Sequence, residues 1–495
     1  MNAFVRNAFP AMPGGGSDLD LPHIRPSGIE EQPPLPQQLV EIHGWGRAAG
    51  AMSHLHGIES VADVVSALRQ GGGRGVTPRG LGRSYGDAAQ NSGGITLDLT
   101  RLDKILSVDA ASEPPTVTLQ AGVSIDTLMK ALLPFGLWVP VLPGTRQVTI
   151  GGAIAADVHG KNHHTQGSFG NHVRSFDLLM PDGSVKTLDR PAGDTWDALD
   201  DDGRLFWGTI GGMGLTGAIV GAVVELQRVE TAYFTVDTDR CSDIDDLMAR
   251  MSTGDDSYNY SVAWFDAVTR GKHMGRAVLT RGDKAKLSQL DPKRRREPLR
   301  FAAPSFGTIP EVFPNRMVNV ATAKAFSEFW FRKAPKHQVG ALQNITAFFH
   351  PLDIVAEWNR LYGPNGFLQY QFVVPFSAHE TFKRCFEMIV TSGHLSCLNV
   401  LKRFGPGNLS PLSFPMPGWT LTVDLPIEAG LDKLCDALDE EVVSVGGRVY
   451  LAKDSRLTAE RFRQMYPRLD AFLAVRDRAD PEHLFISDLA RRLAL

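Results

Sequence analysis

The first half of the chain alternates short apolar runs, rich in β-branched residues, with glycine-rich turns, a pattern typical of strands joined by tight loops. Six such runs are VTPRG, GITLDL, PTVTLQAG, SFDLLMPDG, SVKTL and LTGAIVGAVVEL. Helical patterns interrupt them at residues 60–70 and 124–133, each with a serine suited to cap the helix N-terminus. The pattern predicts an α+β domain from about Val40 to Leu226.

The amino-acid composition changes between about residues 233 and 445, where glycine becomes less frequent and aromatic residues become more frequent. The candidate strands FLQYQFVVP and GWTLTVDLP alternate with helical patterns at residues 378–392 and 430–445. A second domain is therefore predicted. Beyond it lie VYLAKDSR, a helix beginning near Thr458, and the closing DPEHLFISDLARRLAL.

Two segments lack a periodic apolar pattern. Residues 1–38 contain GGGS and a proline-dense stretch, which predicts a flexible tail. Residues 284–304 contain DPKRRREPLR, which predicts a mobile loop without packed structure.

Composition and charge narrow the classes of protein. The 495 residues, 43% hydrophobic and 21% charged, are those of an ordinary folded protein long enough for at least two domains. The formal charge, 51 − 55 = −4, gives no overall attraction to nucleic acid, and no nucleic-acid partner is expected. The four cysteines are scattered and form no C-x-x-C pair, so a reducing compartment fits best.

A membrane span is not expected. The longest uncharged stretch, residues 208–224, contains six glycines and falls short of the roughly 18–20 apolar residues that a span requires. No apolar run follows Arg6, so no secretory signal is visible. The sequence predicts a cytoplasmic protein, with membrane association and the periplasmic face left open.

The densest glycine segment, RGLGRSYGD at residues 79–87, allows three interpretations. Its glycines do not fit the G-x-G-x-x-G fingerprint of a dinucleotide-binding turn. Gly82, Ser84 and Gly86 match the G-x-S-x-G of a serine hydrolase, but DAAQNSGG cannot supply the helix that must follow. The remaining interpretation is a backbone cradle for a pyrophosphate, with Arg79 or Arg83 supplying charge.

Two more glycine-rich loops, residues 143–164 and 208–217, favour the cradle. Three such loops in one domain suggest a long ligand with a charged middle, such as a flavin dinucleotide. His159 and His163 have i, i+4 spacing, but Gly160 and Asn162 argue against the helix that would bring them together on one face. No metal site is predicted.

Several long segments carry a resemblance to a known family. RGLGRSYGDAAQNSGG, the loop PGTRQVTIGGAIAADVHGKNHH, GFLQYQFVVP, YLAKDSR and DPEHLFISDLARRL resemble the decaprenylphosphoryl-β-D-ribose 2′-oxidase family. These are flavoproteins of the vanillyl-alcohol oxidase superfamily. The resemblance runs from about Gly44 to the C-terminus.

The resemblance implies a two-domain α+β fold of the vanillyl-alcohol oxidase (PCMH) type. Residues 39–231 and 448–495 would form the FAD-binding domain, and residues 232–447 an inserted substrate domain over an antiparallel sheet. FAD-binding positions carried over by motif are Arg79, Gly80, Leu81, Gly82, Arg83, Ser84, Tyr85, Gly86, Asp87, Gly144, Thr149, Ile150, Gly151, Gly152, Ala156, Asp157, Val158, His159, Ile219 and Tyr450. The first loop offers Tyr85 in place of the histidine that many relatives use for covalent attachment, so non-covalent FAD is expected.

The implied reaction is oxidation of the ribose 2′-hydroxyl of decaprenylphosphoryl ribose to a ketone. It would be the first half of an epimerisation to the arabinose product for cell-wall arabinan, completed by an NADH-dependent keto-reductase partner. The resemblance assigns Lys453 to the flavin and the substrate, with His159 as the other catalytic residue. Further residues expected at the substrate are Lys161, Trp264, Gln371 and Thr422. Whether Lys453 or His159 accepts the hydroxyl proton, and whether the electrons pass to quinone or oxygen, stays open.

Other functions compete with this one. The nearest is a same-fold FAD oxidase acting on another sugar, alditol or aldonolactone. A flavin-binding scaffold and a serine hydrolase acting through Ser84 are more distant.

The sequence departs from the family pattern in the substrate domain. The family segment after GW reads asparagine, isoleucine, cysteine, and here it reads Thr420, Leu421, Thr422. Thiol-directed inhibitors of the family should therefore fail, although turnover needs no thiol there. A family tyrosine is replaced by Phe349, which removes a hydroxyl from the pocket.

Basic residues lie beside aromatic ones in residues 284–301 and 326–333. Such segments can attract anionic headgroups, which predicts a peripheral membrane contact for a lipid-linked substrate. The alternative is a solvated loop followed by a core helix.

Overall fold

The computed structural model describes residues 37–495 apart from residues 71, 316 and 318. The first strand begins at Gln37, three residues before the start predicted at Val40. All but the last two residues of the predicted flexible tail lie outside the described residues.

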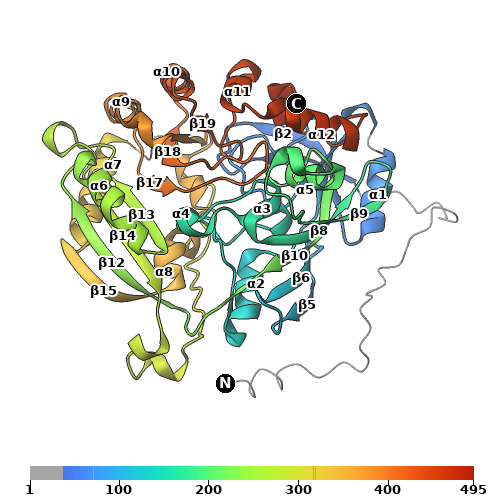
Figure 1. The fold of residues 1–495 in the computed structure, drawn as a ribbon. Helices are drawn as coiled ribbons and strands as arrows, with labels where there is room; N and C mark the ends of the chain where they lie inside the picture. The colour runs from blue at the N-terminus through green and yellow to red at the C-terminus, as the bar shows by residue number, and fades with distance from the viewer. Residues whose placement is uncertain (1–36, 71, 316, 318) are drawn as a thin grey trace.

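The N-terminal part forms a small mixed sheet. Its strands are β1 (Gln37–His43), β2 (Gly50–Gly57), β3 (Val76–Arg79) and β4 (Ile95–Asp98), in the order β1-β2-β4-β3. β4 runs parallel to both of its neighbours, and helix α1 (Val61–Gln70) supplies the buried residues Val64, Ala67 and Leu68 to the core beside it. Val76 exchanges backbone hydrogen bonds with Leu484 and Ile486, so the C-terminal end of the chain packs against this sheet (Figure 1).

A five-stranded antiparallel sheet follows, in the order β5-β6-β10-β8-β9. Its strands are β5 (Ile105–Asp109), β6 (Thr116–Gln120), β8 (Val173–Leu179), β9 (Val185–Asp189) and β10 (Ala218–Glu225). The helices are α2 (Ile125–Leu132), α3 (Ile150–Ala155), α4 (His163–Gln166) and α5 (Asp201–Thr209), and β7 (Leu137–Trp138) pairs with β11 (Gln227–Arg228). Ser124 caps α2 by accepting a hydrogen bond from Thr127 N, as its sequence position predicts.

The middle of the chain builds an eight-stranded antiparallel sheet in the order β15-β12-β14-β13-β17-β18-β16-β19. Its strands are β12 (Tyr233–Cys241), β13 (Tyr260–Phe265), β14 (Ala277–Lys284), β15 (His337–Asn344), β16 (Phe367–Val374), β17 (Asn399–Phe404), β18 (Gly418–Pro426) and β19 (Arg448–Val449). Its helices are α6 (Ile244–Gly254), α7 (Val320–Lys333), α8 (Ile345–Phe349), α9 (His379–Thr391) and α10 (Leu431–Ser444).

Strands β16 and β18 are buried at every position, and their polar residues alternate with apolar ones, so one face of each strand carries polar side chains into the interior. Three helices close the chain: α11 (Ala459–Met465), α12 (Leu469–Ala479) and α13 (Asp488–Leu493). In Figure 1 the large sheet and α6 to α8 form one lobe, while the five-stranded sheet and the C-terminal helices lie in the other. The predicted two-domain α+β fold is confirmed, and its exact domain boundaries stay predictions.

One local prediction was wrong. The basic segment after β14 is not without packed structure: it contains short 3-10 helices at Leu287–Gln289 and Arg294–Arg296, and Leu290 is 2% exposed. The reason is local hydrogen bonding, because Asp291 accepts from the backbone of Lys293 and Arg294 and also pairs with the Arg294 side chain. Repulsion among the neighbouring arginines does not prevent these turns.

Candidate active site

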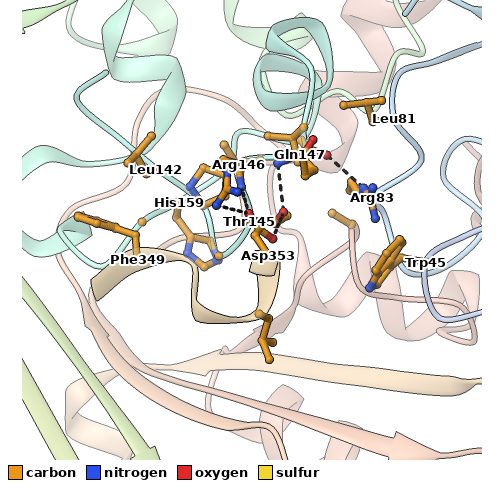
Figure 2. Close-up of a pocket in the computed structure, with 18 of the residues that line it drawn as sticks. Trp45, Leu81, Arg83, Leu142, Thr145, Arg146, Gln147, His159, Phe349 and Asp353 are labelled. Atoms are coloured by element: carbon orange, nitrogen blue, oxygen red, sulfur yellow. Dashed lines mark hydrogen bonds and ion pairs between the residues drawn. The ribbon is translucent and has the colours of Figure 1, made fainter. Parts of the chain in front are cut away.

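A cavity of about 920 Å³ lies where the glycine-rich loops meet the large sheet. It is lined by the three glycine-rich loops, by the turn after β19, and by residues of β13, β14, β16, β17 and β18. Figure 2 shows one part of it, with Leu81, Arg83 and Trp45 on one side and Leu142, His159 and Phe349 on the other. All but four of the site residues predicted from sequence line this cavity.

The four exceptions have packing roles. Ile150 is fully buried in the core, and Asp87 forms a two-pronged ion pair with Arg492 in which both distances are 2.8 Å. A Cβ atom on Gly86 would lie 1.8 Å from the carbonyl oxygen of Asp454. The fourth, Asp157, is fully buried and accepts four hydrogen bonds from other loops.

The first glycine-rich loop is held by its two arginines. Arg79 donates to the carbonyl oxygens of Ala89 and His43, at 2.9 and 2.8 Å, so part of its hydrogen-bonding capacity shapes the loop. Arg83 lies over the ring of Trp45, 3.9 Å from its centroid, and donates to Gln147 O at 3.2 Å (Figure 2). Burial lowers the pKa of Arg79 to about 10, still far above neutral pH, so the group stays cationic.

The glycine-rich loops at residues 79–87 and 143–164 approach each other closely at the N-terminus of α3. Thr149 caps this helix by accepting from Gly152 N, and a Cβ on Gly80 would lie 2.2 Å from Thr149 Oγ1. Only glycine at position 80 permits this contact. The result is a surface of backbone N–H groups beside cationic Arg79 and Arg83, which fits the pyrophosphate of a flavin dinucleotide.

The loop at residues 143–149 is tied to the other lobe through Asp353. The Asp353 carboxylate accepts from Thr145 Oγ1 at 2.7 Å and from Arg146 N at 2.8 Å (Figure 2). The Arg146 guanidinium also pairs with Asp126. Burial raises the pKa of Asp353, and these hydrogen bonds oppose the shift. Sequence reasoning missed Asp353, because nothing in HPLD indicates which loop it contacts.

Lys453 lines the cavity next to the first glycine-rich loop. Its Nζ is 3.7 Å from the centroid of the Tyr85 ring, and the turn that carries it is closed by a hydrogen bond from Lys453 N to Tyr450 O. Burial lowers the pKa of Lys453, and the buried carboxylate of Asp424 opposes that shift. The free amine is therefore more accessible to Lys453 than to an ordinary lysine.

His159 is enclosed by aromatic rings, with centroids 4.7 Å from Phe404 and 5.4 Å from Tyr450. Its Nε2 lies 3.1 Å from the amide nitrogen of Gln371. Burial is the largest cause that holds the pKa of His159 well below its usual value, and the ammonium of Lys402 adds to it. His159 is therefore neutral.

Two further lysines line the cavity. Burial lowers the pKa of Lys161 to about 7 and that of Lys402 to about 8. Lys161 donates to the carbonyl of Phe348, whereas Lys402 approaches His159 Nδ1 at 3.4 Å. Sequence reasoning missed Lys402, although its alternation with Val400 and Phe404 in β17 places all three on one face of the sheet.

The remaining substrate-side residues lie on the large sheet. Trp264 donates from its indole nitrogen to Cys397 O and faces Trp330 of α7, with ring centroids 6.4 Å apart. Thr422 lines the cavity where the family pattern has cysteine, and Phe349 packs among aromatic rings with 3% exposure. Neither position offers a thiol or a phenolic hydroxyl.

In the part of the chain that the structure describes, the histidines do not gather with other metal-ligating side chains into a group that could hold a metal ion. Within residues 37–495, leaving out the three that are not described, no three or more His, Cys, Asp or Glu side chains gather as metal ligands. No helix in the described part of the chain is long and apolar enough to cross a bilayer. The segment after Ser84 forms turns and no helix up to residue 94, so the hydrolase motif lacks its required context.

Two family models match the chain. One, described as an FAD binding domain, covers residues 54–189, and the other, described as D-arabinono-1,4-lactone oxidase, covers residues 424–493. With the two-lobed fold and the glycine-lined cavity, these matches define an FAD-dependent oxidoreductase. The expectation of FAD as cofactor is confirmed.

Similar proteins define the family more closely. The chain is 51% identical to decaprenylphosphoryl-β-D-ribose oxidase of Mycolicibacterium smegmatis over 93% of this chain and 99% of that protein. It is also 37% identical to an uncharacterised Streptomyces coelicolor protein over 75% of this chain and all of that protein. L-galactono-1,4-lactone dehydrogenase 1 of Oryza sativa is 29% identical over 40% of this chain and 32% of the plant enzyme. The chain belongs to the decaprenylphosphoryl-β-D-ribose oxidase family.

Proposed function

We propose that this protein oxidises the 2′-hydroxyl of decaprenylphosphoryl-β-D-ribose to the 2′-keto sugar. The observation that carries the proposal is the near full-length similarity to an oxidase named for that substrate. The gathering of Lys453, His159, Lys161 and Gln371 around one cavity supports it.

FAD, when bound, supplies the acceptor for the hydride that leaves the sugar carbon. The protein's part is to hold the cofactor and the sugar and to receive the hydroxyl proton. Lys453, when protonated, supplies positive charge beside the cofactor's first loop, where it stabilises charge that develops during reduction. Lys453 as the free amine and neutral His159 are the two groups in the cavity suited to take the proton.

The cofactor is proposed to be non-covalently bound, because the first loop carries Tyr85 and no histidine. Acid precipitation of the purified protein should release all of the yellow colour into the supernatant. Flavin that stays with the pellet would contradict non-covalent binding.

The reaction is tested by anaerobic titration of the purified holoenzyme. Decaprenylphosphoryl ribose should bleach the flavin absorbance, and free alditols and aldonolactones should not. A protein without flavin, or a flavin that the phosphoryl ribose leaves oxidised, would refute the proposal.

A second candidate function is oxidation of an aldonolactone. It is favoured by the match of the D-arabinono-1,4-lactone oxidase model to residues 424–493, which include Lys453. Bleaching by lactones in the same titration, without bleaching by the phosphoryl ribose, would select it.

We also propose that an NADH-dependent keto-reductase consumes the product, since an epimerisation must reduce the ketone that the first step forms. Adding a candidate reductase and NADH to the reaction should yield the arabinose epimer. Persistence of the ketone with every such reductase would contradict this partner.

A peripheral membrane contact is proposed for residues 284–301 and α7. Helix α7 exposes Phe326 and Phe329, at 38% and 60%, and Lys333 Nζ lies 5.7 Å from the centroid of the Phe329 ring. Exposed aromatics beside cations suit an anionic lipid surface. Neutralising residues 293–296 should weaken co-sedimentation with anionic liposomes, and unchanged binding would refute the contact.

A further inference from the structure

We propose that Lys402 binds the phosphate ester of the substrate and so selects phosphorylated sugars over neutral ones. This inference rests on the proposed function and assigns the anionic part of the substrate to a residue of β17. The chemistry requires such a site, because the phosphate is attached to C1, next to the C2 that is oxidised. The phosphate is therefore only a few bonds from C2, so a cavity that holds C2 beside the cofactor must also hold the phosphate.

Lys402 is placed to meet that phosphate. It lies on the cavity face of β17, and its Nζ is 3.4 Å from Nδ1 of His159, which is itself expected at the sugar. Among the described residues, that ring nitrogen is the only hydrogen-bond partner of the Lys402 side chain, and no carboxylate forms an ion pair with its ammonium. At least two of its three N–H donors are left for a ligand.

The other two lysines of the cavity are more fully engaged. Lys161 donates to Phe348 O and lies 4.8 and 5.5 Å from the ring centroids of Phe348 and Phe349. Lys453 lies over Tyr85 and interacts with the charge of Asp424. Of the three, Lys402 is the one whose ammonium lacks both a carboxylate and a ring to offset its charge.

The electrostatics of the cavity favour an anion. The charge of Lys402 acts on Lys161, His159 and Lys453, so it lies near all three. Among the described residues, Asp424 is the only buried carboxylate that acts on this group of lysines. Burial in low dielectric makes such uncompensated ammonium groups costly, which is why their pKa values fall. A phosphate that enters the cavity restores the balance and forms charge-assisted hydrogen bonds.

The test uses the flavin of the holoenzyme as a probe of binding. Farnesyl phosphate and farnesol, which differ only in the phosphate, are titrated into wild type, Lys402→Met and Lys402→Arg while the flavin spectrum is followed. Lys104→Met, at an exposed position, is the matched control. We expect Lys402→Met to weaken farnesyl phosphate binding about 30-fold or more, to leave farnesol binding within about 3-fold, and Lys402→Arg to recover part of the loss.

Steady-state kinetics with a charged and a neutral substrate distinguish two roles for Lys402: binding the phosphate and positioning His159. For Lys402→Met, kcat/KM should fall for a prenylphosphoryl riboside and stay within about 3-fold for the neutral prenyl riboside. An equal loss with both substrates would show that Lys402 only positions His159, and no loss with either would remove it from the site. Both results overturn the proposal.

A competition experiment distinguishes a site for the substrate's phosphate ester from a site for free phosphate. Inorganic phosphate should compete with farnesyl phosphate only weakly, and equal affinity for the two would mean a free-phosphate site and overturn the assignment to the substrate. Failure of the proposed function has a different signature: the wild-type flavin would not be bleached by the phosphoryl riboside, whereas the binding titrations would still report on Lys402.

Discussion

Lys453 differs from a surface lysine because its ammonium group is buried over an aromatic ring, at the point where the resemblance places the flavin. A cation held there in low dielectric stabilises charge more strongly than one in water. The side chain makes no hydrogen bond on which the first glycine-rich loop depends, so its removal tests the chemistry without dismantling the site.

Lys453→Met should therefore retain FAD and lose turnover. We expect the rate of flavin reduction by substrate to fall by about 100-fold or more, measured by anaerobic stopped-flow absorbance. Lys433→Met, at an exposed position on α10, should reduce flavin at the wild-type rate. Normal reduction in Lys453→Met would show that another residue has the central role.

Burial also fixes the charge of His350. Its Nε2 lies 3.1 Å from Pro143 O, and burial lowers its pKa to about 3. As the pH falls below about 6.5, the His350 imidazole binds a proton in the unfolded chain but stays neutral in the folded chain. The contribution of His350 to stability is thus complete above that pH and is lost toward pH 3.

The free energy of unfolding should consequently fall by about 1.4 kcal/mol per pH unit through this group as the solution is acidified. His350→Gln should reduce that slope in melting temperature against pH between about 6.5 and 4, whatever its effect at neutral pH. His273→Gln, at an exposed position, should leave the slope unchanged. An identical slope in His350→Gln would contradict this account.

Glycine-rich loops and helix caps are the features that the sequence predicted best. α1, α2, α9, α10 and α11 begin within one residue of their predicted starts, since serine and threonine caps and apolar periodicity act locally. The structural reason for each individual glycine was harder to predict from the sequence. Gly86 belongs to the motif shared with FAD enzymes, yet its space is taken by the turn after Lys453.

Gly86→Ala should therefore disturb the docking of two loops. Its Cβ would lie 1.8 Å from the backbone oxygen of Asp454, which cannot move aside as a side-chain end can. We expect a loss of about 1–3 kcal/mol in stability, seen as a lower melting temperature, together with reduced flavin content. Gly144→Ala is the matched control for folding, because a Cβ there meets no protein atom within 4 Å.

The two lobes are joined by buried polar contacts as well as by apolar packing. Asp157 accepts from Ser168 Oγ and Gly170 N, both at 2.8 Å, and from Asn408 Nδ2 and Ser413 Oγ on the segment between β17 and β18. The carboxylate thus connects the loop that carries His159 to the large sheet. Its assignment to FAD by motif stays untested, and the geometry gives it a role in holding these loops together.

Asp157→Ala would leave several buried donors without an acceptor. We expect a loss of about 3 kcal/mol or more in the free energy of unfolding, and a rise in KM that follows from displacement of His159. Chemical denaturation monitored by tryptophan fluorescence measures the first effect. Asp182→Ala, which breaks only an exposed turn, should cost less than about 1 kcal/mol, and a similarly small loss in Asp157→Ala would refute the bridging role.

The sequence by itself determined the local elements, the α+β class, the three glycine-rich loops and the family, because these depend on short-range periodicity, caps and contiguous motifs. Only the tertiary structure decided that Lys402 meets His159, that Asp353 holds the loop at Thr145 and Arg146, and that Asp157 bridges two lobes. Each of these contacts joins residues more than two hundred positions apart. The chain must fold before burial sets their charge and partners, so no local pattern could have indicated them.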